Sequence, residues 1–179
     1  MKRAMLIVTI LFIAVISTAC INNFAVQELN NKAKIYLDNG DYDSAINRLE
    51  ASTDLDGTIF ETQYNLGVAY INAKKYDKAV IALTKATKLN SKFADAYQTL
   101  GFSQESYAEK LLDFENKEVK IDKDFSKDER IELAKTMYLN AIKSYKKYVE
   151  LSPDSEDAKV ADERIKDIED DLTEVGNKK

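Results

Sequence analysis

Few residues in this chain could do chemistry, and the single thiol is the most distinctive of them. Cys20 is the only cysteine, and the 179 residues contain no histidine. Without histidine there is no Ser-His triad, no histidine acid–base pair and no histidine metal ligand. Carboxylates are plentiful but alternate with lysine, which is typical of solvated helix faces rather than of paired catalytic acids. The sequence therefore predicts a protein that is not an enzyme and that uses no metal and no cofactor.

The overall charge also narrows the classes of partner. The net charge is −5, and loss of Lys2 and Arg3 with a leader peptide would remove two positive charges and make it −7. Phosphate binding needs a basic face, so this balance disfavours nucleic acid as a partner. The five glycines are scattered along the chain and cannot form a phosphate-binding loop.

The segment before Cys20 has the order of a secretory leader. A basic start at Lys2 and Arg3 is followed by an apolar run over residues 4–16 and by the small residues 17–19. The apolar run is short for a membrane-spanning helix, which needs about 20 residues. We therefore expect residues 1–19 to be a signal peptide.

Ser17-Thr18-Ala19-Cys20 resembles the lipobox of bacterial lipoproteins. The resemblance implies a diacylglycerol on the thiol of Cys20, cleavage before it, and acylation of the new N-terminus with a fatty acid such as palmitate. Several acyl chains hold a protein stably to a membrane. Lipoboxes usually carry leucine where this chain has Ser17. A leader cut near Ala19 that leaves a free thiol, and an uncleaved anchor, are the alternatives.

The residue after the cysteine bears on localisation. By the same resemblance, Ile21 in place of aspartate disfavours retention on the inner membrane. We expect a lipid-anchored protein on the extracytoplasmic side of the cell envelope. Where the cell has two membranes, we expect it in the periplasm, anchored to the outer membrane.

A motif recurs at a period of 34 residues and is the strongest structural signal in the chain. Its clearest copy contains Leu66-Gly67 followed by Tyr70, and equivalent residues stand at Tyr36 and at Leu100-Gly101. A fixed period in this range indicates stacked supersecondary units.

These residues resemble the tetratricopeptide repeat, a family whose 34-residue units carry an aromatic residue, Leu-Gly, Tyr and then spaced alanines in a second helix. The matching positions of the second unit are Leu66, Gly67, Tyr70, Ala79, Leu83 and Ala86. The resemblance implies an all-α fold, an α-solenoid of about three helix hairpins packed large-into-small, and a function in binding.

The chain divides into five segments in this interpretation. They are the signal peptide at 1–19, the lipidated cysteine with a short linker at 20–25, the solenoid at 26–153, a C-terminal helix at 154–175 and a tail at 176–179. The repeat units run over about 26–59, 60–93 and 94–153, and the second unit has helices over about 60–73 and 76–89.

The third unit carries an insertion of about 28 residues, at about 105–140. Apolar residues up to Phe114 extend the stripe of its first helix, and Ser126-Lys-Asp-Glu129 is a capping box that starts the second near 127. Two helices of about 25 residues, each roughly 37 Å long, would project beyond the first two hairpins, with a turn at about 120–126.

A further helix is expected after Ser152-Pro153, because proline is favourable at the first helical position. Its apolar positions recur at spacings of three and four and are Ala158, Ala161, Ile165, Ile168, Leu172 and Val175. A helix that caps the last repeat is the favoured interpretation. A dimer-forming helix is the alternative, so the sequence leaves monomer and homodimer open.

Stacked hairpins of this kind curve into a concave groove lined by the first helix of each unit. The residues expected to face a protein or peptide partner there are Asn30, Lys34, Tyr64, Asn65, Val68, Ile71, Gln98 and Phe102. One subfamily clamps a C-terminal carboxylate in this groove. At its five positions this chain has Asn30, Lys34, Asn65, Asp95 and Thr99. Only Asn65 fits and Asp95 would repel a carboxylate, so that specificity is not expected.

The tip of the projecting hairpin, with Ile121 and Phe125, is a second candidate for partner binding. The sequence thus predicts a membrane-anchored scaffold or assembly factor that binds a protein at the bacterial cell envelope. A self-associating structural lipoprotein without a dedicated peptide groove is the alternative. A lipoprotein that binds peptidoglycan or a small ligand would need a polar pocket, which no motif marks.

Overall fold

A computed structural model describes residues 23–115 and 125–177, and the regular elements in those ranges are all helices. The first helix is described over residues 23–38. The others are α2 (Tyr42–Leu55), α3 (Phe60–Asn72), α4 (Tyr76–Leu89), α5 (Ala94–Leu112), α6 (Lys127–Leu151) and α7 (Glu156–Asn177). The chain is already helical at residue 23, three positions before the predicted start at 26.

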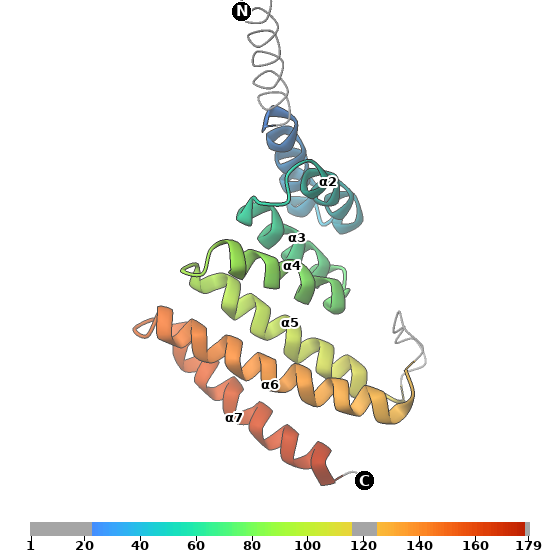
Figure 1. Cartoon of the computed structure of the whole chain (residues 1–179), viewed down its shortest axis with the longest axis vertical. Helices are drawn as coiled ribbons and strands as arrows, with labels where there is room; N and C mark the ends of the chain where they lie inside the picture. Colours follow the sequence, from blue (N-terminus) through green and yellow to red (C-terminus); the bar gives the residue numbers. More distant parts are fainter. Residues whose placement is uncertain (1–22, 116–124, 178–179) are drawn as a thin grey trace, which may run out of the picture.

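Each helix packs on the next along the chain, so the helices form a solenoid rather than a closed bundle (Figure 1). One hydrophobic cluster joins the first helix to α2, α3 and α4, and a second joins α5, α6 and α7. Leu100 belongs to the first cluster, whereas Ala108 and Leu111 belong to the second. Helix α5 therefore links the two halves of the core.

The turns repeat with the same 34-residue period as the sequence. The backbone N–H of Asp41 donates to the carbonyl of Tyr36 at 2.9 Å, and that of Lys75 donates to the carbonyl of Tyr70 at 2.8 Å. The residues before them, Gly40 and Lys74, both have positive φ. This left-handed conformation is the usual way to close a helix, and it is unstrained only for glycine.

The loops between hairpins repeat as well. The side chain of Asp56 accepts a hydrogen bond from the N–H of Thr58 at 2.8 Å. Asn90, 34 residues later, accepts one from the N–H of Lys92 at 3.2 Å. Both are turns held by an Asx side chain, which satisfies local backbone donors at the ends of α2 and α4.

Two glycines let the two helices of a hairpin approach closely. A Cβ added to Gly67 would lie 2.4 Å from Cγ of Leu83, and one added to Gly101 would lie 2.9 Å from the ring of Tyr145. The paired residues are 16 positions apart in one hairpin and 44 in the other. The difference of 28 is the length of the predicted insertion, so the insertion leaves the packing register of the third hairpin unchanged.

The third hairpin projects past its neighbours, as predicted, but its two helices differ in length (Figure 1). Helix α6 has 25 residues and begins with the predicted capping box of Ser126 and Glu129, whereas α5 has only 19. The prediction of about 25 residues for the first helix was wrong. Phe114, expected on its apolar stripe, lies beyond the helix end and is 41% exposed.

An arginine from α6 accounts for the early end of α5. Nε of Arg130 donates to the carbonyl of Leu111 at 2.8 Å, and Nη2 donates to that of Asp113 at 3.0 Å. These carbonyls have no partner inside the helix, so a cation at this place satisfies them and favours termination. The guanidinium also lies 4.5 Å from the ring centroid of Phe114.

The C-terminal helix begins two residues later than predicted. Pro153 lies in the turn after α6, and α7 starts at Glu156, where Oγ of Ser155 accepts a hydrogen bond from the N–H of Ala158 at 3.1 Å. A serine hydroxyl at this position is a favourable N-cap. Five of the six residues of the predicted stripe are buried, namely Ala158, Ala161, Ile165, Ile168 and Val175. The stripe thus covers the end of the solenoid.

The predicted signal peptide, Cys20, the hairpin-tip residue Ile121 and the end of the tail lie outside the described residues. In the described ranges, 23–115 and 125–177, none of the helices has the length and apolar character that crossing a membrane requires.

The glycine contact can be tested in the second hairpin. Gly67→Ala is expected to lower the free energy of unfolding by about 1–3 kcal/mol, because the new methyl group overlaps Leu83. Leu83→Ala alone is expected to cost about 2–5 kcal/mol through the cavity it leaves. Urea unfolding of the full-length chain measures both.

The double variant supplies the control for this prediction. If the glycine is needed for close packing, the losses are less than additive, because the alanine at position 67 fills space vacated by Leu83. Strictly additive losses would contradict the proposed contact.

Candidate functional site

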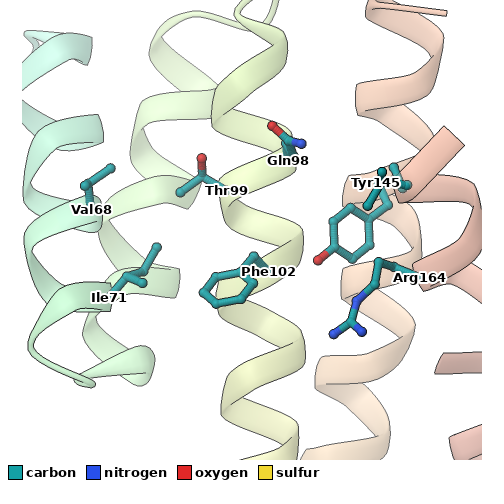
Figure 2. A pocket seen from close by; sticks show the side chains of 9 residues that line it. Val68, Ile71, Gln98, Thr99, Phe102, Tyr145 and Arg164 are labelled. Carbon is teal, nitrogen blue, oxygen red and sulfur yellow. The ribbon is translucent and has the colours of Figure 1, made fainter. Parts of the chain in front are cut away.

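The first helices of successive units form a hollow on one face of the solenoid (Figure 2). It has a volume of about 500 Å³. Its lining comes from α3, α5, α6 and α7 and consists of Val68, Ile71, Gln98, Thr99, Phe102, Tyr145, Val160, Ala161 and Arg164. We call this hollow the groove pocket. Its walls are largely apolar, with a few polar groups, which is the usual composition of a ligand-binding hollow.

Half of the predicted groove residues line this pocket. Val68 and Ile71 project from α3, and Gln98 and Phe102 project from α5 (Figure 2). Phe102 is 43% exposed, although large apolar side chains are usually buried. Its ring, together with Val160 of α7, which is 51% exposed, offers apolar surface to a partner.

The other predicted residues do not line the pocket. Tyr64 is half-buried, and its ring packs edge-to-face on Phe93 with centroids 5.2 Å apart. Nδ2 of Asn30 donates to Oγ1 of Thr62 at 2.8 Å, which ties the first helix to α3. Tyr64 and Asn30 therefore have contacts within the protein that account for them. Asn65 is half-buried, and Lys34 is exposed.

Sequence reasoning missed the wall that α7 contributes, although the repeat itself contains the signal. Val68 and Phe102 are 34 positions apart, and Arg164 follows Phe102 by 62, which is one period plus the 28-residue insertion. By the same count, Val160 is equivalent to Gln98. Helix α7 thus occupies the place that the first helix of a fourth repeat unit would take, which is why it lines the pocket.

A buried carboxylate organises the wall formed by α5, α6 and α7. The side chain of Glu105 is 4% exposed. Its carboxylate accepts a hydrogen bond from the hydroxyl of Tyr145 at 2.8 Å, and it forms an ion pair with Arg164. Tyr145 is the residue that fills the space above Gly101. The three side chains, here called the Glu105 network, therefore connect the packing core to the pocket.

Burial and the neighbouring charges shift the pKa values of Glu105 and Tyr145 in the network. Burial raises the pKa of Glu105, while the hydrogen bond from Tyr145 and the charge of Arg164 act to lower it. Burial, with the nearby Glu105, also raises the pKa of the Tyr145 hydroxyl. Tyr145 therefore stays protonated and remains a donor.

Nothing in the described residues is arranged as a metal site, because they contain no group of three or more side chains able to ligate one ion. The groove pocket instead offers apolar surface, an amide, two hydroxyls and a guanidinium. These groups suit non-covalent recognition of a peptide rather than bond-making chemistry.

Comparison with known proteins agrees with the geometry. Residues 30–98 match the profile of the family described as tetratricopeptide repeat. The chain has a tetratricopeptide-repeat fold. Domains of this kind are typically non-catalytic modules for protein interaction. A search of curated proteins gives no match.

Solved tetratricopeptide-repeat structures resemble the whole arrangement. The first such domain of Spaghetti (RPAP3), bound to an HSP90 peptide, is 22% identical with a TM-score of 0.59 over 83% of this chain and 93% of that one. The Arabidopsis OM64 domain is 19% identical, with a TM-score of 0.61 over 82% and 98%. The MamA protein is 26% identical, with a TM-score of 0.58 over 89% and 72%. These likenesses show the fold.

The Glu105 network leads to a prediction about stability. Arg164→Ala leaves the buried carboxylate of Glu105 without its cation. The side chain of Arg164 is 41% exposed, so solvent screening reduces the expected loss in free energy of unfolding to about 1–2 kcal/mol at pH 8. Urea unfolding at several pH values measures it.

The loss should shrink on acidification. Arg164 lowers the pKa of Glu105, so its removal raises that pKa further. Because the pKa of Glu105 in the folded variant is raised, Glu105 is protonated at low pH and the variant keeps its free energy of unfolding there. That free energy falls as the pH rises through the raised pKa and the uncompensated carboxylate ionises. Arg164→Lys, which keeps the charge, is the matched control. A loss from Arg164→Ala that stays constant from pH 4 to pH 8 would contradict the ion pair.

Proposed function

We propose that this protein is a membrane-anchored interaction scaffold or assembly factor of the bacterial cell envelope, and that it binds a partner protein in the groove pocket. One observation carries the proposal. Phe102 lies solvent-exposed in an apolar hollow of about 500 Å³ that four helices build. The interaction fold and the peptide-bound state of the RPAP3 domain support it.

The pocket suits an extended segment that presents an apolar side chain. The ring of Phe102, with Val68 and Ile71 from the neighbouring helix, forms an apolar floor, while Gln98 and Thr99 can hydrogen-bond a peptide backbone. Oγ1 of Thr99 already donates to the carbonyl of Asp95, which leaves its lone pairs for a peptide N–H. An anchor seated in this hollow would supply most of the binding energy.

The expected ligand differs from a C-terminal carboxylate clamped by basic side chains. Asp95 is exposed on the first turn of α5 and would repel such a group. The cation that lines the groove pocket, Arg164, already pairs with Glu105. Its Nη1 atom also lies 3.9 Å from Oδ2 of Asp167. The proposed specificity therefore rests on apolar contact rather than on charge.

The anchor would hold the solenoid close to the bilayer. Helical structure is described from residue 23, so only Ile21 and Asn22 separate it from Cys20. Three peptide units span at most ~11 Å. A lipid on Cys20 would thus place the first helix beside the headgroups. The lipobox resemblance and Ile21 support an outer-membrane location where two membranes exist.

Self-association through α7 has less support than the scaffold role. The apolar stripe that a dimer would need is already buried, and Ala161, Ile165 and Ile168 belong to the cluster with α5 and α6. The face of α7 that remains exposed is mainly charged. The structure offers this alternative no unpartnered apolar stripe on the described part of the helix.

The groove proposal predicts the effect of one charged substitution. Phe102→Asp is expected to weaken partner capture roughly tenfold or more, because an exposed aromatic side chain of the apolar floor is replaced by a charge. Crosslinking in cells with the full-length chain, followed by affinity purification and mass spectrometry, measures capture. Circular dichroism verifies that the variant is folded.

Leu139→Asp is the matched control, since Leu139 is 51% exposed on α6 and lines none of the pockets described here. Partners that bind in the groove should be lost with Phe102→Asp and kept with Leu139→Asp. Capture of the same proteins by both variants would exclude the groove pocket as the docking site.

The anchor proposal makes a separate prediction. The native protein should begin at an acylated Cys20, and Cys20→Ala should leave the leader uncleaved and the lipid absent. Intact-mass spectrometry of both proteins measures this. An unmodified N-terminus downstream of Cys20 in the native protein would refute lipidation.

A further inference from the structure

A second hollow lies where the long third hairpin extends past α4. It has a volume of about 630 Å³. Its lining comes from the first half of α4, the last part of α5, a residue just before α6 and the first half of α6. It consists of Asp77, Val80, Ile81, Tyr107, Phe125, Glu129, Glu132, Leu133, Thr136 and Met137. We call it the step notch, because it arises where the insertion makes one hairpin longer than the next.

The floor of the step notch is apolar and reachable from solvent. Ile81 is 59% exposed, although it lies on a helix whose other face is buried in the core. Leu133 and Met137 pack on the second hydrophobic cluster from one side, and Val80 packs on the first from the other. The notch therefore bridges two rigid parts of the core and needs no rearrangement to exist.

The rim of the notch has one sign of charge. Asp77, Glu129 and Glu132 line it, and no lysine or arginine does in the described part of the chain. Glu129 remains at the helix start as half of the capping box. Glu132 pairs with Lys135 at 2.8 Å but is 73% exposed. An apolar floor inside an acidic rim complements a segment that presents apolar side chains beside cations.

The step notch and the groove pocket have no lining residue in common. The groove pocket is lined mainly by the first helices of the units and carries Arg164, whereas the notch is lined mainly by second helices and carries carboxylates. The acidic rim of the notch discriminates between partners by charge, whereas binding in the groove pocket rests on apolar contact, so the two hollows suit partners of different chemistry. Occupation of one does not cover the residues of the other.

We infer that the step notch docks a second protein partner through a short segment with leucine-like side chains flanked by lysine or arginine. The charge of the rim selects against anionic lipid surfaces and acidic peptides. The proposed scaffold would then hold two partners at once, one in each hollow, and the insertion in the third unit would serve to build the second site. Binding at the step notch does not depend on the groove proposal, whereas the two-partner scaffold rests on it.

Fluorescence anisotropy with designed peptides tests the inference. Three labelled 12-residue peptides share the same leucines and differ in carrying lysine, serine or glutamate between them. The full-length chain is placed in phosphatidylcholine nanodiscs, whose zwitterionic surface does not attract cations, and empty nanodiscs give the background. The lysine peptide is expected to bind most tightly and the glutamate peptide least.

Charge reversal supplies the decisive variant. Asp77→Lys with Glu132→Lys is expected to weaken the lysine peptide roughly 5- to 30-fold and to strengthen the glutamate peptide. Ile81→Asn should weaken all three peptides, while the matched variant Leu139→Asn should change none. Phe102→Asn, which alters the groove pocket, should leave this binding intact.

Several results would overturn the inference. They are equal binding of the lysine and glutamate peptides to the native chain, an unchanged lysine preference after charge reversal, and loss of binding with Phe102→Asn. Light scattering could also show a dimer of the chain that the lysine peptide dissociates. In that case the step notch would bind a second copy of the chain rather than the proposed partner.

Discussion

The contact of Gly101 with Tyr145 is the interaction on which the rest of this structure depends. Because Gly101 has no side chain, α6 approaches α5 closely enough for the tyrosine ring to lie against the backbone. The hydroxyl of Tyr145 then reaches Glu105, and Glu105 in turn pairs with Arg164 of α7. One close approach thus positions the third hairpin, the capping helix and one wall of the groove pocket.

The long hairpin is compatible with a regular solenoid because its extra residues lie outside this contact. Gly67 with Leu83 and Gly101 with Tyr145 are equivalent pairs, although 28 more residues separate the second pair. The added length extends both helices of the hairpin, since α5 has 19 residues and α6 has 25, against 13 in α3 and 14 in α4. The extension emerges at one end of the hairpin (Figure 1). Repeat packing is preserved, and a step with an acidic rim is created beside α4.

Much of the fold could be predicted because the repeat determines it locally. The 34-residue period located α3 and α4 to within a residue, and the capping box placed the start of α6 at Lys127. The groove was less predictable. Val68, Ile71, Gln98 and Phe102 line the pocket, whereas Tyr64 packs on Phe93, because facing outward from a helix does not reveal whether a neighbouring loop covers the side chain.

The sequence by itself determined the helical class, the phase of the hairpins and the small residues at their contacts, since these follow from periodicity and from side-chain size at fixed spacing. The tertiary structure alone decided where α5 ends, because Arg130 of α6 donates a hydrogen bond to the carbonyl of Leu111 at its C-terminus. It alone brought Arg164 to Glu105, 59 residues away, and joined α4 to α6 around a notch. Such contacts depend on how helices distant in sequence cross. The repeat period indicates which positions of α7 are equivalent to those of α5, but it does not specify the side chains with which they pair.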